Sequence, residues 1–315
     1  LFTRLDGIAI SLNRYTRNVS IIENEIVWNG DSAVTSWGDT EPILFENSTS
    51  MVTTMGWDGT NGNQPRMTNF IRNFVHEIGI NEKQSSMWFQ AKSCSNYLHG
   101  NIFFNGPRAG INFNDGFGGN STLFKNILFN TCRESGDHGP FNSWDRQVYI
   151  TKVLNGSSSV IKQYDYIIQN FVIGNYESRW CIDTDDGSSY YEVHDNFLVY
   201  AQSGMKNYDS GHDVHHYSNI YGYIEGGSND FCLYDNDHQY PGHKDWYFNN
   251  TCIVDQIYQE NYTKFDCTKP QNTWPILGNN TIHYMGNQYN NTGNCGLNEQ
   301  QFQQKYNTDL GTIII

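Results

Sequence analysis

The chain has 315 residues, of which 37% are hydrophobic, 15% aromatic and only 17% charged, and its formal net charge is −14. This acidic balance excludes nucleic acid as an expected partner, because binding to phosphates needs clusters of Lys and Arg. No run approaches 18 consecutive apolar residues, so the sequence predicts no membrane span. The composition instead indicates a surface of Asn, Ser, Thr, Gly and Tyr, as in extracellular proteins that contact or carry sugars.

A short pattern recurs along the chain: two or three strand-forming residues, an Asn, and two or three more strand-forming residues, as in 21–27, 98–104 and 193–199. The repeated asparagines are Asn24, Asn73, Asn101, Asn126, Asn170, Asn196, Asn219, Asn250 and Asn287. Most gaps between them are 23 to 31 residues, and the gaps of 49 and 44 are each about two such periods. This is the period of a parallel β-helix with three short strands per coil.

Asparagine suits the corner of such a coil for two reasons. It tolerates the left-handed backbone conformation that a sharp bend between strands needs. Its amide can also hydrogen-bond to the equivalent Asn in the next coil, which forms a ladder along the stack. The short apolar runs on either side point into a narrow core, and no stretch has a sustained helical period, so we expect very little helix.

Other all-β folds explain the pattern less well. A sandwich predicts closely spaced hairpin turns along the whole chain, and a propeller predicts about four strands in each repeat. Neither accounts for one Asn per coil. The sequence therefore predicts an all-β, single-domain, right-handed parallel β-helix over residues 1–255 with long loops on one face. Residues 256–315 are expected to continue the solenoid as a C-terminal coil and a disulfide-stabilised cap.

The chain contains seven cysteines, an odd number that leaves at least one thiol without a partner in the chain. None of them forms a CxxC pair, so the sequence does not support a zinc or redox site of that type. Four cluster toward the C-terminus and are the expected disulfide partners: Cys232, Cys252, Cys267 and Cys295. The other three are expected to be small buried residues of the repeat: Cys94, Cys132 and Cys181.

N-x-S/T sequons give the strongest indication of the cellular compartment. The eight are Asn18, Asn47, Asn120, Asn155, Asn249, Asn261, Asn279 and Asn290. Together with the cysteines they predict a secreted, extracellular glycoprotein from a eukaryotic secretory pathway, carrying covalent N-glycans. The chain begins at Leu1 rather than Met, so we expect it to be a processed or partial form.

Two polar segments, 106–146 and 179–213, interrupt the repeat and are the candidate sites of function. Residues one coil apart lie about 5 Å apart in a β-helix, so acids from different coils can line one groove. Glycoside cleavage needs two carboxyl groups beside the bond, and close packing of acids raises the pKa of one of them. The predicted catalytic residues are Asp137, His138, Asp183, Asp185, Asp186, Lys206 and His212. The predicted substrate-binding residues are Arg108, Asp115, Arg133, Glu134, Trp144, Asp145, Arg146, Trp180 and Asp213.

Five stretches carry a resemblance to a known group of proteins: 83–86, 106–119, 132–146, 181–190 and 211–213. Over residues 5–255 the chain resembles right-handed β-helix glycoside hydrolases with fucosidase- and xylanase-like members, and more distantly the polygalacturonases. This resemblance implies a carbohydrate-active protein with a polysaccharide or glycan as its partner.

The likeness to polygalacturonases is partial. Asp183, Asp185 and Asp186 are similar to the acid cluster of those enzymes, and His212 is similar to their histidine. Here Gly-His-Asp replaces Gly-His-Gly, and no matching Arg-Ile-Lys follows, so the catalytic roles do not transfer residue by residue.

Several alternatives remain open at this stage. The groove can belong to a glycoside hydrolase, or to a lyase or epimerase with Lys206 or His212 as base. It can also be vestigial in a structural coat, sheath or fibre glycoprotein that assembles through the ends of the solenoid. No cofactor is required, although 183–186 offers oxygen ligands for calcium. A metal site at 212–216 is disfavoured, because neighbouring residues on a strand face opposite ways.

Overall fold

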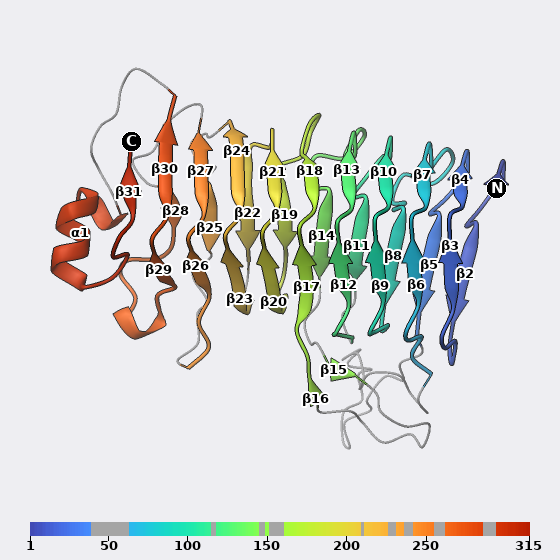
Figure 1. Cartoon of the computed structure of the whole chain (residues 1–315), viewed down its shortest axis with the longest axis horizontal. Coiled ribbons are helices and arrows are strands. Elements are labelled where there is room, and N and C mark those ends of the chain that lie inside the picture. The colour runs from blue at the N-terminus through green and yellow to red at the C-terminus, as the bar shows by residue number, and fades with distance from the viewer. Residues whose placement is uncertain are drawn as a thin grey trace, which may run out of the picture.

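The computed structural model describes residues 1–38, 63–114, 118–144, 149–150, 161–208, 211–225, 231–235, 242–254, 262–285 and 294–315. At 149–150 and 161–162 only the backbone is described. Short parallel strands stack along one axis into three long sheets, and they confirm the predicted all-β parallel β-helix (Figure 1). The predicted right-handed coil is the hand that parallel crossovers almost always take.

Sheet 1 contains eleven strands. In stacking order they are β1 (Phe2–Thr3), β4 (Glu25–Val27), β7 (Phe74–His76), β10 (Ile102–Phe104), β13 (Ile127–Phe129), β18 (Phe171–Ile173), β21 (Phe197–Val199), β24 (Ile220–Ile224), β27 (Thr251–Val254), β30 (Thr281–Tyr284) and β31 (Ile313–Ile314).

Sheets 2 and 3 contain nine strands each. Sheet 2 consists of β2 (Ile10–Asn13), β5 (Val34–Trp37), β8 (Trp88–Ala91), β11 (Ile111–Asn114), β14 (Phe141–Trp144), β19 (Trp180–Thr184), β22 (Ser203–Asn207), β25 (Leu233–Asp235) and β28 (Thr263–Lys264). Sheet 3 consists of β3 (Ser20–Ile22), β6 (Asn69–Ile71), β9 (Tyr97–His99), β12 (Thr122–Phe124), β17 (Asp165–Ile168), β20 (Ser189–His194), β23 (His212–Tyr217), β26 (Trp246–Phe248) and β29 (Ile276–Gly278).

Each coil visits sheet 2, then sheet 3, then sheet 1. The two long gaps in the Asn spacing are single coils with insertions, not two coils as predicted, because β4 pairs directly with β7 and β13 pairs directly with β18. Both insertions fall between a strand of sheet 2 and a strand of sheet 3. The second contains a small antiparallel pair, β15 (Tyr149–Ile150) and β16 (Ile161–Lys162).

The core is a narrow interior filled by the inward-facing residues of the three sheets. In sheet 2 these inward residues form a column of Val34, Trp88, Ile111, Phe141, Ile182, Met205 and Leu233. Their neighbours in the sequence point outward, because side chains alternate along a strand. The register of the coils therefore decides which polar residues share the outer face.

The Asn ladder runs through nine coils of the described chain, at the corner between sheets 3 and 1. The backbone N–H and the Nδ2 of each Asn donate to Oδ1 of the next Asn, at 2.8–3.1 Å and 2.9–3.3 Å. The last ladder residue is Asn280 and not the predicted Asn287. Asn287 lies outside the described residues. Asn280 in turn donates its backbone N–H to Thr312 Oγ1 at 3.0 Å.

The left-handed residue of each corner is not the ladder Asn but the residue before it. These residues are Glu23, Arg72, Gly100, Lys125, Gln169, Asp195, Ser218, Asn249 and Asn279, all with φ between 51° and 65°. The expectation that the ladder Asn itself adopts this conformation was therefore wrong. The ladder side chain instead fixes the corner by bonding to the coils on either side.

The C-terminal part continues the three sheets through β28, β29, β30 and β31, with short 3₁₀ segments at η2 (Gln271–Thr273) and η3 (Asn294–Gly296). Beside the last coil lies α1 (Glu299–Tyr306), at the C-terminal end of the stack in Figure 1. Asn298 caps this helix through a capping box with Gln301. Phe302 is fully buried, and its ring stacks on Trp274 with 6.1 Å between centroids.

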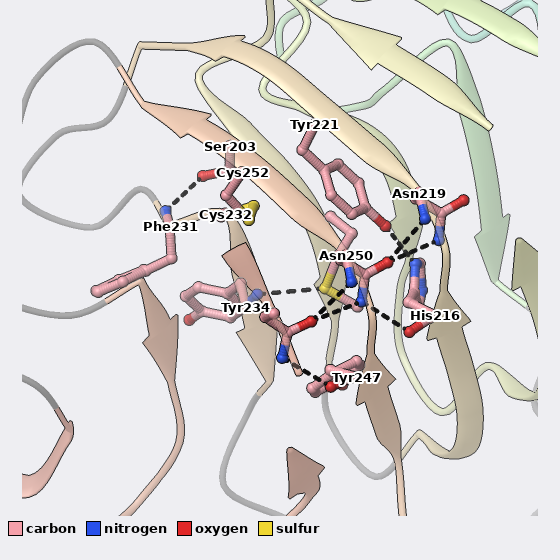
Figure 2. Close-up of a disulfide and its surroundings, with 12 residues drawn as sticks. Ser203, His216, Asn219, Tyr221, Phe231, Cys232, Tyr234, Tyr247, Asn250 and Cys252 are labelled. Atoms are coloured by element: carbon pink, nitrogen blue, oxygen red, sulfur yellow. Dashed lines mark hydrogen bonds between the residues drawn. A yellow bond between two sulfur atoms is a disulfide. The ribbon is translucent and has the colours of Figure 1, made fainter. Parts of the chain in front are cut away.

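The four C-terminal cysteines form disulfides, as predicted, and the structure gives the pairs as Cys232–Cys252 and Cys267–Cys295. Cys232 precedes β25 and Cys252 lies in β27, so their bond crosses the buried interior beside the Asn219–Asn250 step of the ladder (Figure 2). The remaining three cysteines form no disulfide and are buried, again as predicted: Cys94, Cys132 and Cys181. Two disulfides are typical of proteins from oxidising compartments.

Among the residues that the structure describes, no helix is both long and apolar enough to cross a membrane.

Candidate functional site

The outer face of sheet 2 carries a column of residues, polar except for Phe89, one position away from the inward column. From the N-terminal coil onward these residues are Ser11, Thr35, Phe89, Asn112, Asn142, Asp183, Lys206, Tyr234 and Lys264. The solenoid register thus brings residues from both predicted polar segments onto one face. Within this column, an acid and a base from consecutive coils stand side by side as Asp183 and Lys206.

Lys206 forms an ion cluster with two of the predicted catalytic acids. Its Nζ lies 2.7 Å from Oδ1 of Asp185 and 3.2 Å from Oδ1 of Asp183. Asn142 Nδ2 donates to the other oxygen of Asp183 at 2.9 Å. The side chains of Asp183 and Lys206 are 0% and 7% exposed, whereas that of Asp185 is 28% exposed. Asp185 is therefore the carboxylate of the cluster that a ligand can reach.

Burial determines the charge states in this cluster. It raises the pKa of Asp183 to about 7; the neighbouring ammonium of Lys206 lowers that pKa and the Asp185 charge raises it further. Burial also works against the charge of Lys206, but the two carboxylates outweigh it and raise the pKa of the ammonium. Lys206 therefore stays protonated, which makes it a poor general base for the lyase alternative.

Aromatic side chains enclose the ammonium of Lys206. The ring centroids of Trp180 and Tyr208 lie 4.0 and 4.7 Å from Nζ, at cation–π distances. Trp180 is only 5% exposed, so its ring covers Lys206 and is not open to a substrate as predicted. Tyr208, which is 36% exposed, provides the reachable ring. Trp144 Nε1 donates to Asp186 Oδ2 at 2.8 Å and so orients a third predicted acid.

Arg108 and His138 lie at the same centre. Arg108 Nη2 is 3.5 Å from His138 Nδ1, and the charges of Asp137, Asp183 and Asp185 all act on the guanidinium. Burial, followed by the positive charge of Arg108, lowers the pKa of His138 to about 4. The imidazole is therefore neutral near pH 7 and cannot act there as a general acid.

Two other predicted residues have their described ion pairs elsewhere. Arg133 Nη1 lies 3.9 Å from Glu77 Oε2, and Lys83 Nζ lies 3.0 Å from Glu134 Oε1, with both predicted side chains exposed to solvent. Three further predicted residues lie outside the described part of the chain: Asp115, Asp145 and Arg146.

His212 and Asp213 belong to a second cluster, which includes a residue that sequence reasoning missed. Asp213 Oδ2 is 2.8 Å from His212 Nδ1 and 2.7 Å from His243 Nδ1. The signal that could have found His243 is the local coil length. Trp246 is the strand partner of His215 in the next coil. His243 lies as many residues after His212 as Trp246 lies after His215, so it occupies the equivalent position in that coil.

A third feature, on the outer face of sheet 3, also escaped prediction. A groove of about 510 Å³ is lined by Glu192, His215, Tyr217, Trp246, Phe248 and Asn249. Glu192 lies 2.9 Å from His215 Nδ1, and the Trp246 ring stacks on this imidazole with 4.6 Å between centroids. Alternation along β20, β23 and β26 places these side chains outward, and this period could have been read from the sequence.

Four of the eight sequons fall in the described residues, and all four of their asparagines have left-handed backbones: Asn18, Asn120, Asn249 and Asn279. Asn249 and Asn279 are left-handed corner residues directly before ladder residues, and each stands in the sequence Asn-Asn-Thr. All four of these asparagines are exposed. The sequons that lie outside the described residues are Asn47, Asn155, Asn261 and Asn290.

A scan against models of protein families, a search of curated proteins and a search of solved structures each find no match for this chain. The resemblance to β-helix glycoside hydrolases therefore stays a prediction from the sequence.

Proposed function

We propose that this protein is a secreted glycoprotein that binds an extracellular polysaccharide across the outer face of sheet 2 and cleaves it in a glycoside hydrolase-type reaction. The observation that carries the proposal is the cluster of Asp183, Lys206 and Asp185. In this cluster the carboxylate of Asp185 is partly exposed to solvent, whereas the side chains of Asp183 and Lys206 are buried.

A contribution to the stability of the fold does not explain why these charged residues are buried together. Two charges removed from water lose more hydration energy than their attraction returns, unless their geometry and hydrogen bonding are very good. A hydrophobic pair of similar size would stabilise the fold at least as well. An ion cluster on the outward face, next to a half-exposed acid, is instead the arrangement expected where charge is used on a ligand.

The residues around the cluster can divide the work of a glycosidase. Asp185 is the reactive carboxylate, and Lys206 holds it in place through the 2.7 Å contact. The second carboxyl group that the reaction needs comes from Asp137, which is exposed, or Asp186, which is partly exposed. Asp183 is a positioning residue, because it is fully buried and reaches the site only through Lys206.

The test is a screen of plant, algal and fungal polysaccharides, with binding measured by affinity electrophoresis and cleavage by the release of reducing ends. We expect Asp185→Asn to retain binding and to lose at least ~100-fold in cleavage rate. Asp137→Asn and Asp186→Asn then identify the second carboxyl group, since only one of them should cause a comparable loss. Asp195→Asn, a left-handed corner position where Asn is well tolerated, is the control and should behave as wild type.

A second candidate is a glycan-binding structural protein without catalysis. The observation that favours it is the burial of Asp183 and Lys206. Asp185 is then the one carboxylate of the ion cluster that a ligand can reach, whereas glycoside cleavage needs two carboxyl groups. Saturable binding with no product from any polysaccharide would support this candidate against the hydrolase. Neither binding nor cleavage on the whole panel would contradict both.

A further inference from the structure

We propose that His212, Asp213 and His243 form a binding site for one divalent transition-metal ion, for which Zn²⁺ is the probe. Their ligand atoms all lie within 4.8 Å of one another, in the one described cluster of three or more metal-ligating side chains. The proposal is independent of glycan binding on sheet 2, because it involves other residues and a different chemistry.

The solenoid register places the two imidazoles together. Pairing of β23 with β26 joins His215 to Trp246 and Tyr217 to Phe248, which sets the length of this coil. His243 follows His212 by that same length, and so occupies the equivalent position one coil further along. Their ring centroids are 4.5 Å apart, as expected for side chains on neighbouring coils.

The backbone at Asp213 brings the carboxylate onto the same side as the imidazoles. In a regular strand, His212 and Asp213 would point to opposite faces. Asp213 instead has a left-handed backbone with φ of 55°, and its Oδ2 reaches both imidazoles at 2.7–2.8 Å. The argument from strand alternation against a metal here therefore does not hold for this pair.

The donor set suits a transition metal. Two imidazole nitrogens and one carboxylate oxygen form the ligand set of many zinc and non-haem iron sites, whereas Ca²⁺ prefers oxygen ligands alone. The side chains of His212 and Asp213 are 21% and 16% exposed, but that of His243 is 45% exposed. The site is thus held on one side by the strand and remains open on the other for a water or ligand oxygen.

Neighbouring groups orient the ligands. The ring of Tyr190 meets that of His212 edge-on, with 5.2 Å between centroids and an interplanar angle of 87°. The backbone N–H of His212 donates to Ser189 Oγ at 3.2 Å, which anchors this residue to the coil below. These contacts hold His212 in place. For both imidazoles to bind a metal through Nδ1, each must carry its proton on Nε2, and the metal ion replaces their hydrogen bonds to Asp213.

The chain contains a matched control. His194 and Asp195 are also adjacent, with Nδ1 and Oδ2 2.9 Å apart, and Asp195 also has a left-handed backbone with φ of 57°. No second imidazole contacts this pair among the described residues. If a His–Asp neighbour pair alone sufficed for metal binding, the two sites would behave alike.

The experiment is isothermal titration of the full chain, stripped with EDTA, with Zn²⁺, and visible spectroscopy after titration with Co²⁺. We expect one Zn²⁺ per chain, a Co²⁺ spectrum with nitrogen and oxygen ligands, and a higher melting temperature with Zn²⁺ than with EDTA. His243→Gln and Asp213→Asn should each weaken the affinity at least ~10-fold, whereas His194→Gln should not change it.

Circular dichroism in EDTA checks that the variants remain folded, and His243→Gln changes a side chain that is 45% exposed, so its fold should be unchanged. Absence of stoichiometric Zn²⁺ binding by the wild type would overturn the proposal. So would unchanged affinity in folded His243→Gln, or an equal loss in His194→Gln. Equal binding of Ca²⁺ would contradict the assignment to a transition metal.

Discussion

Replacement of Asn126 by Ala tests how much the ladder stabilises the fold. Asn126 is 1% exposed and lies in the interior of the ladder. Its Oδ1 accepts hydrogen bonds from the backbone N–H and the Nδ2 of Asn101, at 3.0 and 2.9 Å. Its Nδ2 donates to Asn170 Oδ1 at 3.0 Å and to the carbonyl of Leu98 at 2.9 Å. The substitution removes all four bonds and keeps the backbone intact.

The magnitude follows from these contacts. A buried hydrogen bond contributes a net of about 1 kcal/mol, and a buried group left without a partner costs about 1–3 kcal/mol more. Asn101 keeps its Nδ2 bond to the carbonyl of Phe70, so the loss is partial there. We therefore expect Asn126→Ala to lower the free energy of unfolding by about 4 kcal/mol, a large share of the stability of an ordinary domain.

The first ladder residue provides the matched control. Asn24 is half-buried, and its side chain donates to the carbonyl of Ile22 at 2.9 Å and to Asn73 Oδ1 at 3.3 Å. Asn24→Ala should therefore cost only about 1 kcal/mol. Guanidinium unfolding followed by circular dichroism measures both changes, with the slope m checked for constancy. Equal losses at the two positions, or a loss below about 1 kcal/mol at Asn126, would refute the view that interior ladder bonds stabilise the coils.

Three further outcomes are expected. Gly100→Ala should lower the free energy of unfolding by about 1 kcal/mol, because Gly100 has a φ of 65° that Ala adopts less readily. The added methyl group makes only an ordinary contact at 3.6 Å, so sterics should add nothing. A neutral effect in guanidinium unfolding would contradict this prediction. Replacement of both Cys232 and Cys252 by Ser removes a disulfide that closes a loop with a sequence separation of 20. Under non-reducing conditions this should lower the free energy of unfolding by about 3 kcal/mol in the same assay. Reductant should abolish the difference from wild type. Burial, followed by the charge of Asp309, raises the pKa of Glu299 to about 9, so the folded state keeps a proton that the unfolded state loses above about 4.5. Wild-type stability should therefore fall as pH rises from about 4.5 to 9, by at most about 1.4 kcal/mol per unit, and Glu299→Gln should flatten this slope in pH-dependent melts; parallel slopes would contradict the assignment.

The sequence alone determined the architecture, because the ladder requires one Asn per coil within a short local pattern. The β-helix, the low helix content and the division between disulfide-bonded and buried reduced cysteines were all predicted from such local signals and confirmed. The errors came where spacing was ambiguous. Two long coils were counted as four, and Asn287 was chosen over Asn280, because loop insertions change the spacing without changing the stack.

Only the tertiary structure decided which polar residues form a site. Asp183 and Trp180 were predicted to face a ligand, yet neighbouring coils bury both of them. His243 was not predicted at all, yet it meets Asp213 from the next coil. The physical reason is that a solenoid fixes neighbours by coil register, and that register depends on the length of every loop between strands. A repeated Asn therefore reveals the stack, whereas burial and charge pairing emerge only when the coils lie on one another.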